Sequence, residues 1–165
     1  MIVRRAGPGD IDRIDEIYNQ AVLEKFLVGD VTPWSKEKRL AWYKDHDNDD
    51  YPLYVADVDG RAVGFVYITA YRPGRMALKQ TVEISFYIDR DYRGKGIGKI
   101  LIDHTEAECI KKGIKTMFAI IMDCNKICIK LVEKCGYEKW GHLPKIALFD
   151  GIEVGHLYYG KRVMP

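Results

Sequence analysis

The segment Arg93-Gly94-Lys95-Gly96-Ile97-Gly98-Lys99 constrains the fold more than any other part of the chain. Alternating glycines allow a tight backbone turn that brings several N–H groups close to one anion. A run of alternating polar and apolar residues, Thr81–Ile88, precedes the segment, and apolar residues with helical spacing follow it until Gly113. The prediction is a strand, a glycine loop and a helix, whose positive end adds to an anion site.

The charges of this loop indicate which anion it binds. Basic side chains at Arg93, Lys95 and Lys99 favour a polyphosphate. A Walker A loop is disfavoured, because Ile100 follows Lys99 where that motif requires Ser or Thr. A dinucleotide-binding fingerprint is disfavoured as well, since Lys99 stands in place of its third glycine. The alternative is a tight turn with solvated lysines that binds no ligand.

The order of the elements predicts a mixed α/β fold. An antiparallel meander is expected over 53–58, 62–71 and 81–88, and Asp59-Gly60 between the first two runs is a strong hairpin signal. A strand at 114–122 after the glycine-loop helix requires parallel pairing with the run at 81–88. The other elements are a strand at 2–4, helices after Asp10 and after Thr32–Ser35, a helix at Asn125–Lys134 and two strands around Asp150-Gly151. All are assigned to one domain, residues 1–165.

Apolar spacing predicts which helix positions face the core. Leu40 and Tyr43 are assigned to the inner side of the second helix, and Asp10 to the N-cap of the first. The acidic run 45–50 is expected to be a solvated loop. The inner positions of the glycine-loop helix are expected to be Ile97, Ile100, Leu101 and Ala107.

Composition excludes several classes of function. The chain has 24 acidic and 26 basic residues, so no overall field attracts nucleic acid or a membrane. Residues 1–10 lack the apolar core of a signal peptide, and a cytoplasmic protein is expected. Cys124, Cys128 and Cys135 form no paired motif of a tetrahedral metal site, and ordinary thiols are expected there.

The segment Arg93–Gly98 resembles the pyrophosphate-binding loop of GNAT acetyltransferases. Four further stretches are similar to the phosphinothricin acetyltransferase-like branch of that family: Ile14–Asn19, Pro52–Ala56, Val63–Tyr67 and Thr81–Ile88. The resemblance implies a central mixed sheet flanked by helices, in which a splayed pair of strands holds acetyl-CoA. It also implies a homodimer.

The resemblance assigns contacts with acetyl-CoA residue by residue. The pantetheine arm is expected at Phe86, Tyr87 and Ile88, and the pyrophosphate at Gly94, Lys95, Gly96, Ile97, Gly98 and Lys99, with Arg93 at the rim. Asn125 and Lys134 match further cofactor-contacting positions.

The resemblance also implies that Glu83 is the general base that accepts the amine proton; the alternative is a solvated glutamate on a half-exposed strand. The chain departs from its relatives at the general acid, because Val132 stands where they carry Tyr or His. The alternatives for that role are water, Cys128, Cys135, Tyr137 or no group at all. We expect no dedicated acid, since a coenzyme A thiol leaves as thiolate without much help.

Acceptor-binding residues are less well defined. Relatives carry an aromatic residue where Leu78 stands and a tryptophan-containing segment where 147–151 runs. Arg72 and Arg75 are candidates for binding a substrate carboxylate, and Trp34 for lining the acceptor site. The predicted reaction is N-acetylation of an amino acid or an analogue such as phosphinothricin or methionine sulfoximine. The alternatives are acetylation of peptide N-termini, lysine or polyamines, and a non-catalytic acetyl-CoA-binding module.

Overall fold

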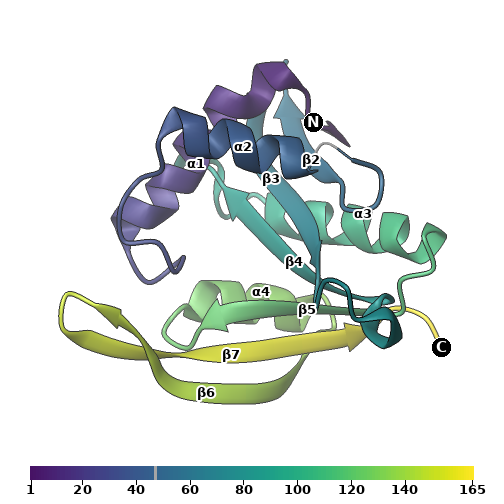
Figure 1. Ribbon diagram of the computed structural model, residues 1–165. Helices are drawn as coiled ribbons and strands as arrows, with labels where there is room; N and C mark the ends of the chain where they lie inside the picture. Colours follow the sequence, from purple (N-terminus) through teal and green to yellow (C-terminus); the bar gives the residue numbers. More distant parts are fainter. Residues whose placement is uncertain (47) are drawn as a thin grey trace.

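The chain is described here by a computed structural model that covers residues 1–46 and 48–165. Within these residues, seven strands form one sheet in the order β1-β2-β3-β4-β5-β7-β6 (Figure 1). The strands are β1 (Ile2–Arg5), β2 (Leu53–Val58), β3 (Arg61–Ala70), β4 (Thr81–Ile88), β5 (Thr116–Met122), β6 (Glu138–Phe149) and β7 (Ile152–Arg162). The helices are α1 (Ile11–Glu24), α2 (Lys36–His46), α3 (Ile97–Lys111) and α4 (Lys126–Lys134), with 3-10 turns η1 (Pro8–Asp10), η2 (Met76–Leu78) and η3 (Arg90–Tyr92).

The first four strands form the predicted antiparallel meander. The hairpin between β2 and β3 turns at Asp59 and Gly60, whose φ angles of 53° and 82° lie in the left-handed region. Two consecutive residues with positive φ match the right-handed twist of the paired strands, which explains the Asp-Gly signal. The hairpin prediction is confirmed.

The pairing between β4 and β5 is parallel and short. It joins Thr81 to Thr116, Val82 to Met117 and Glu83 to Phe118. Beyond Glu83 the two strands diverge, and α3 makes the crossover between them (Figure 1). The predicted splayed pair of strands is therefore confirmed.

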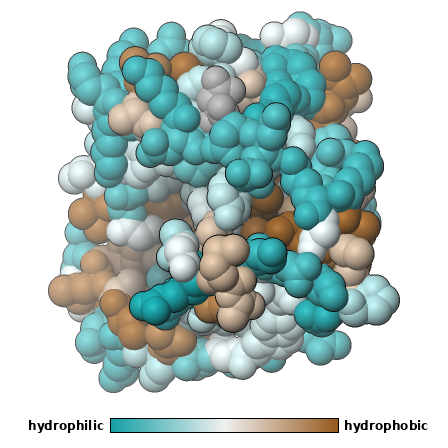
Figure 2. All heavy atoms as spheres, turned by 45° about the vertical axis from the view of Figure 1, so that its right-hand side comes forward, coloured by the Kyte–Doolittle hydropathy of each residue, from teal (hydrophilic) through white to brown (hydrophobic). Residues whose placement is uncertain are grey.

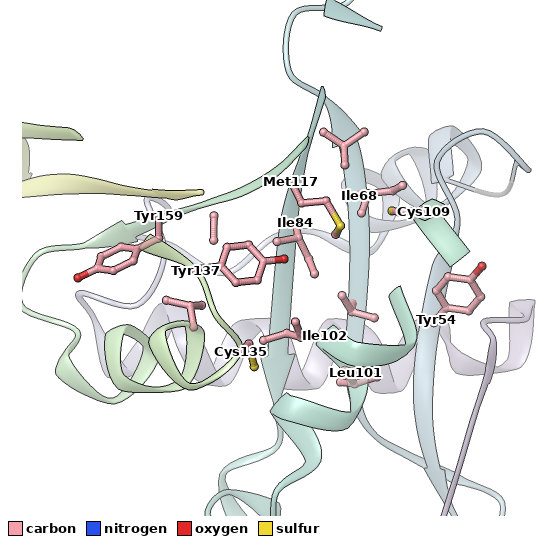
Figure 3. Packing of buried hydrophobic residues seen from close by; sticks show 14 of the residues in the cluster. Tyr54, Ile68, Ile84, Leu101, Ile102, Cys109, Met117, Cys135, Tyr137 and Tyr159 are labelled. Carbon is pink, nitrogen blue, oxygen red and sulfur yellow. The ribbon is translucent and has the colours of Figure 1, made fainter. Parts of the chain in front are cut away.

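Helices cover the two faces of the sheet in separate layers. Leu101 and Ile102 of α3 and Val132 of α4 belong to a core cluster with Ile84 of β4 (Figure 3). A second cluster joins buried residues of α1 and α2 to the opposite face of β2 and β3. Because side chains alternate along a strand, β4 contributes to both layers.

The inner side of α2 differs from the prediction. Leu40 is exposed, whereas Tyr43 and Arg39 are buried. Arg39 replaces Leu40 because its guanidinium pairs with Asp15 of α1 at 3.0 Å and lies over the rings of neighbouring aromatic residues. Helix α2 also runs through 45 and 46 of the expected acidic loop, and Asp47 of that loop lies outside the described residues.

The buried face of α3 also differs from the prediction. Ile97 and Leu101 are buried as expected, but Ile100 and Ala107 are exposed. At 100° per residue, Ile100 and Ala107 project on the side opposite the buried Thr105. The other buried residues of this helix are Gly98, Ile102 and Cys109.

Asp10 precedes α1 as predicted but does not cap it. Its carboxylate accepts a hydrogen bond from the backbone N–H of Gly7 at 2.8 Å and pairs with Arg4 at 2.7 Å. The side chain therefore fixes the turn between β1 and α1 instead of the first turn of the helix. Among the described residues, no helix is long and apolar enough to cross a membrane.

Candidate active site

The open gap between β4 and β5 is the centre of the site. After Glu83, the edge of β4 that faces β5 has no strand partner among the described residues. Backbone N–H and C=O groups on such an edge are available to another extended amide chain. The predicted contacts Phe86, Tyr87 and Ile88 lie along this edge, and β4 continues through η3 into the glycine loop. The gap and the loop form one continuous path (Figure 1).

The glycine loop has the backbone geometry of an anion site. Gly94 and Gly96 have φ angles of 75° and 81°, and a side chain added at either position meets no atom within 4 Å. The first hydrogen bond of α3 runs from the Ile100 N–H to the Gly96 carbonyl at 3.2 Å. The N–H groups of 97–99 therefore point out of the helix end, where the helix dipole favours negative charge.

Gly98 has a different role from the other two glycines of the loop. It lies inside the first turn of α3, where a Cβ atom would meet the Leu131 side chain at 2.6 Å. Its missing side chain lets α4 approach the loop, and Lys134 follows Leu131 by about one helical turn. Asn125, at the other end of α4, caps that helix by accepting a hydrogen bond from the Cys128 N–H at 3.1 Å.

The basic side chains at the loop already have partners within the protein. Arg93 pairs with Glu24 at 2.5 Å, and Lys99 pairs with Asp103 at 2.5 Å. Lys95 donates to a backbone carbonyl at 3.0 Å and lies over the ring of Tyr92. Exposed ion pairs of this kind are weak because solvent screens them, so Arg93 and Lys99 can exchange a carboxylate for a phosphate at low cost.

A buried ion pair supports the loop from below. Asp89, which is 3% exposed, pairs with Arg13 of α1 and accepts a hydrogen bond from the Asp91 N–H at 2.8 Å. Arg13 also donates to the Ala62 carbonyl at 2.9 Å. These contacts tie the end of β4 to α1 and β3. Asp89 is not among the site residues predicted from the sequence, although its place directly after a predicted strand and before the loop was an available signal.

Glu83 lies where the two strands separate, because it is the last β4 residue paired with β5, opposite Phe118. Ile84 packs in the core beneath α3, so Glu83 projects to the opposite face, as Tyr87 does. Burial raises the pKa of the Glu83 carboxyl above its usual value of 4.5. A raised carboxyl pKa is closer to the neutral range in which a general base works best.

Aromatic side chains from the sheet and from the layer of α1 and α2 pack on this face. Tyr87 stacks on Phe65 with a centroid distance of 4.9 Å and contacts Tyr18 at 5.1 Å. Trp34 contacts Tyr18 at 5.0 Å and lies over the guanidinium of Arg39. Trp34 thus belongs to the aromatic cluster of the helical layer. Ring contacts connect it with Tyr87 of β4 through Tyr18, and also through Trp42 and Phe65.

Val132, which stands where relatives carry a general acid, is fully buried. The side chains considered as alternative acids are Cys128, Cys135 and Tyr137. Burial raises the pKa of the Cys128 thiol to about 12 and also raises the pKa of Cys135. The pKa of Tyr137, which lies among apolar side chains (Figure 3), is raised above its usual value by burial. None of these groups has a pKa lowered toward neutrality, as an efficient acid for a thiolate would need.

The two candidate arginines lie on the connector between β3 and β4. The guanidinium of Arg72 lies over the ring of Tyr71, 5.5 Å from its centroid. Tyr71 in turn contacts Phe118, the strand neighbour of Glu83, with a centroid distance of 5.0 Å. Arg72 is therefore linked to the Glu83 region through two aromatic rings. Both Arg72 and Arg75 are exposed.

Comparisons with known proteins agree with this geometry. Residues 14–137 match the Acetyltransferase (GNAT) family. The chain is 35% identical to YwnH of Bacillus subtilis over 92% of each protein. It is 32% identical to the L-methionine sulfoximine/L-methionine sulfone acetyltransferase of Pseudomonas aeruginosa, over 87% of this chain and 84% of that enzyme. A phosphinothricin acetyltransferase from Sinorhizobium meliloti, solved in complex with acetyl-CoA, superposes with a TM-score of 0.91 and 29% identity, covering 98% of this chain and 87% of that one.

Proposed function

The chain belongs to the GNAT acetyltransferase family, and from that premise we propose that it N-acetylates a free amino acid or amino-acid analogue with Glu83 as general base. The observation that carries the proposal is the position of Glu83. The carboxylate lies where β4 and β5 separate, and the glycine loop lies beyond the other end of β4. A cofactor bound along this path has its phosphates at the loop and its reactive end near Glu83.

The residues along the path suit acetyl-CoA. The open edge of β4 at Phe86–Ile88 offers backbone partners to the two amides of pantetheine. The outward N–H groups of 97–99 and the open space above Gly94 and Gly96 suit the pyrophosphate. Lys95, whose ammonium donates to a backbone carbonyl and lies over the ring of Tyr92, provides a positive charge beside it.

Glu83 supplies the proton transfer that the reaction needs. An amino acid arrives mainly as an ammonium ion, and its nitrogen must lose a proton before it attacks the thioester carbonyl of acetyl-CoA. In the proposed step one proton passes from the ammonium to Glu83, directly or through a water, and the neutral amine attacks the thioester. The C–N bond forms, the C–S bond breaks, and the nitrogen releases its second proton to solvent. The thiolate then takes a proton from solvent, because Val132 provides none.

The acceptor class is supported by two kinds of observation. The P. aeruginosa relative is named for methionine sulfoximine and methionine sulfone, and the S. meliloti structure for phosphinothricin. All three compounds combine an α-amino group with a carboxylate. Arg72, whose guanidinium lies over the ring of Tyr71, is the proposed partner of that carboxylate, because Tyr71 contacts Phe118, the strand neighbour of Glu83.

A panel of amine acceptors tests the proposal. Thiol release is measured with acetyl-CoA and free α-amino acids, an unblocked peptide, lysine blocked at its α-amino group, and a polyamine. Turnover concentrated among free α-amino acids is expected. Faster turnover of the peptide, blocked lysine or polyamine would contradict the acceptor class, and acetyl-CoA binding without thiol release for any amine would indicate a binding module.

We also propose a homodimer. Ile146, Leu148 and Ile152 on β6 and β7 are at least half exposed. Apolar side chains gathered on one hairpin are typical of a surface covered by a partner, and a second copy is the commonest partner. Light scattering with size-exclusion chromatography measures the mass in solution, and a monomer mass at micromolar concentration would contradict the dimer.

A further inference from the structure

A hollow of about 450 Å³ lies beside Glu83 on the same face of the sheet. Its volume is within the range of small-molecule sites. The lining residues are Tyr71, Thr81, Phe118, Trp140, Gly141, Leu143 and Tyr158. None of the site residues predicted from the sequence is among them.

Strand register shows that these residues share the face of Glu83. Phe118 pairs with Glu83, and Thr81 lies two residues before it on β4. Tyr158 pairs with Ile120, two residues after Phe118 on β5. Paired residues project to the same side of a sheet and residues two apart project alike, so the floor of the hollow runs from β4 across β5 to β7.

Aromatic side chains line most of the hollow. Phe118 stacks on Tyr158 with a centroid distance of 6.0 Å, and Tyr71 contacts Phe118 edge-on. The Trp140 ring lies directly over Gly160, where a Cβ atom would meet the ring at 2.0 Å. Gly160 thus leaves the space that this ring occupies. Figure 2 shows hydrophobic atoms reaching the surface in the lower part of the molecule, where the β6–β7 hairpin lies in Figure 1.

Charge is confined to the rim. None of the lining residues is charged, and Arg72 lies over the outer wall formed by Tyr71. Because Phe118 lines the hollow and is the strand neighbour of Glu83, an amino acid whose amine lies at Glu83 has this hollow next to it for its side chain. An apolar side chain gains free energy by leaving water there, whereas an acidic one loses hydration without gaining a cation.

We propose, on the basis of the proposed function, that the acceptor is an α-amino acid with an aromatic or long aliphatic side chain, which binds in this hollow. Trp140 and Tyr158 are the specificity-determining residues. The polar, acidic side chain of a phosphinothricin-like acceptor is disfavoured in this chain, because the hollow holds no basic group to pair with it.

The first measurement uses the unmodified protein. The kcat/KM for L-norleucine is compared with that for L-glutamate, since the two side chains have similar length, and L-phenylalanine is compared with L-aspartate. Each apolar acceptor is expected to exceed its acidic counterpart by about tenfold or more. Equal values, or a preference for the acidic acceptors, would overturn the inference while leaving acetyl transfer intact. If none of the amines supports thiol release, both this inference and the proposed function are overturned.

The second measurement assigns the preference to the hollow. Trp140→Ala is expected to reduce kcat/KM for L-phenylalanine about tenfold or more, with a much smaller effect for glycine, which has no side chain to bind. Ile110→Ala is the matched control, because Ile110 of α3 is also an exposed apolar residue, with 41% exposure against 51% for Trp140, and does not line the hollow. Equal losses for L-phenylalanine and glycine in Trp140→Ala, or the same loss in Ile110→Ala, would contradict the assignment.

Discussion

Leu131 of α4 occupies the space that a side chain at Gly98 of α3 would need, at 2.6 Å from the Cβ position. This contact brings α4 against the start of the glycine loop. The third glycine of the loop is therefore required by helix packing, while Gly94 and Gly96 are required by their positive φ angles. A motif that looks uniform in the sequence thus has two separate physical causes.

The contact predicts a coupled stability effect. Gly98→Ala is expected to lower the free energy of unfolding by about 1–3 kcal/mol, because overpacking outweighs the better helix propensity of alanine. Leu131→Ala removes the obstructing side chain, so the double variant is expected to be more stable than the sum of the two single effects. Denaturant unfolding of all four proteins measures the coupling, and additive effects would contradict the contact.

A second prediction concerns the loop backbone. Gly96→Val is expected to abolish acetyl-CoA binding, because a β-branched residue strongly disfavours φ near 81° and its side chain occupies the space for phosphate. Gly60→Val is the matched control, since Gly60 has φ of 82° in the distant β2–β3 turn. The control is expected to lose stability but to keep its affinity in calorimetry. Undiminished affinity in folded Gly96→Val would contradict the position of the pyrophosphate.

Some elements of the fold could be predicted from the sequence more accurately than others. The alternation at Thr81–Ile88 predicted β4 with the bounds that the structure has, and Asp59-Gly60 predicted the hairpin between β2 and β3, because both signals are local. Helix faces were harder to predict. Ile100 is as apolar as Leu101, and only the direction from which the sheet covers α3 decides which of them is buried.

The environment of charged side chains was the least predictable feature. Arg39 is 1% exposed because Asp15 of α1 and aromatic rings from other segments surround it, and counting apolar residues cannot detect such a site. The pairing of Arg93 with Glu24 spans 69 residues and depends on how α1 packs. By contrast, the pairing of Lys99 with Asp103 follows ordinary helical spacing and was open to prediction.

The third prediction concerns protonation of the leaving thiolate. Cys128→Ala, Cys135→Ala and Tyr137→Phe are each expected to keep turnover within about tenfold of wild type, below the usual effect of losing a positioned acid. The reason is that burial raises the pKa of each group, which makes proton donation to a thiolate unfavourable. A loss of a hundredfold or more in one folded variant would identify that residue as the acid.

The fourth prediction concerns Glu83, and its first part is stability. Burial raises the folded-state pKa of this carboxyl, so protons bind more tightly in the folded than in the unfolded chain. Any stability from this group is therefore present below the unfolded pKa and is lost as pH rises through the folded pKa. Glu83→Gln has no charge to desolvate. The variant is expected to unfold at the same or a higher temperature than wild type at pH 7, and acetyl-CoA binding is expected to be unchanged.

The activity of Glu83→Gln is expected to fall, although its stability does not. Wild-type turnover rises with pH as Glu83 ionises, whereas Glu83→Gln cannot accept a proton at any pH. Near neutral pH its kcat/KM is expected to fall by about a hundredfold to ten-thousandfold, the usual contribution of a positioned base. The deficit is expected to shrink as pH rises, because more of the acceptor amine is then already deprotonated. A solvated strand glutamate would instead give a change within a few fold at every pH, so near-wild-type turnover of folded Glu83→Gln below pH 7 would remove Glu83 from the mechanism.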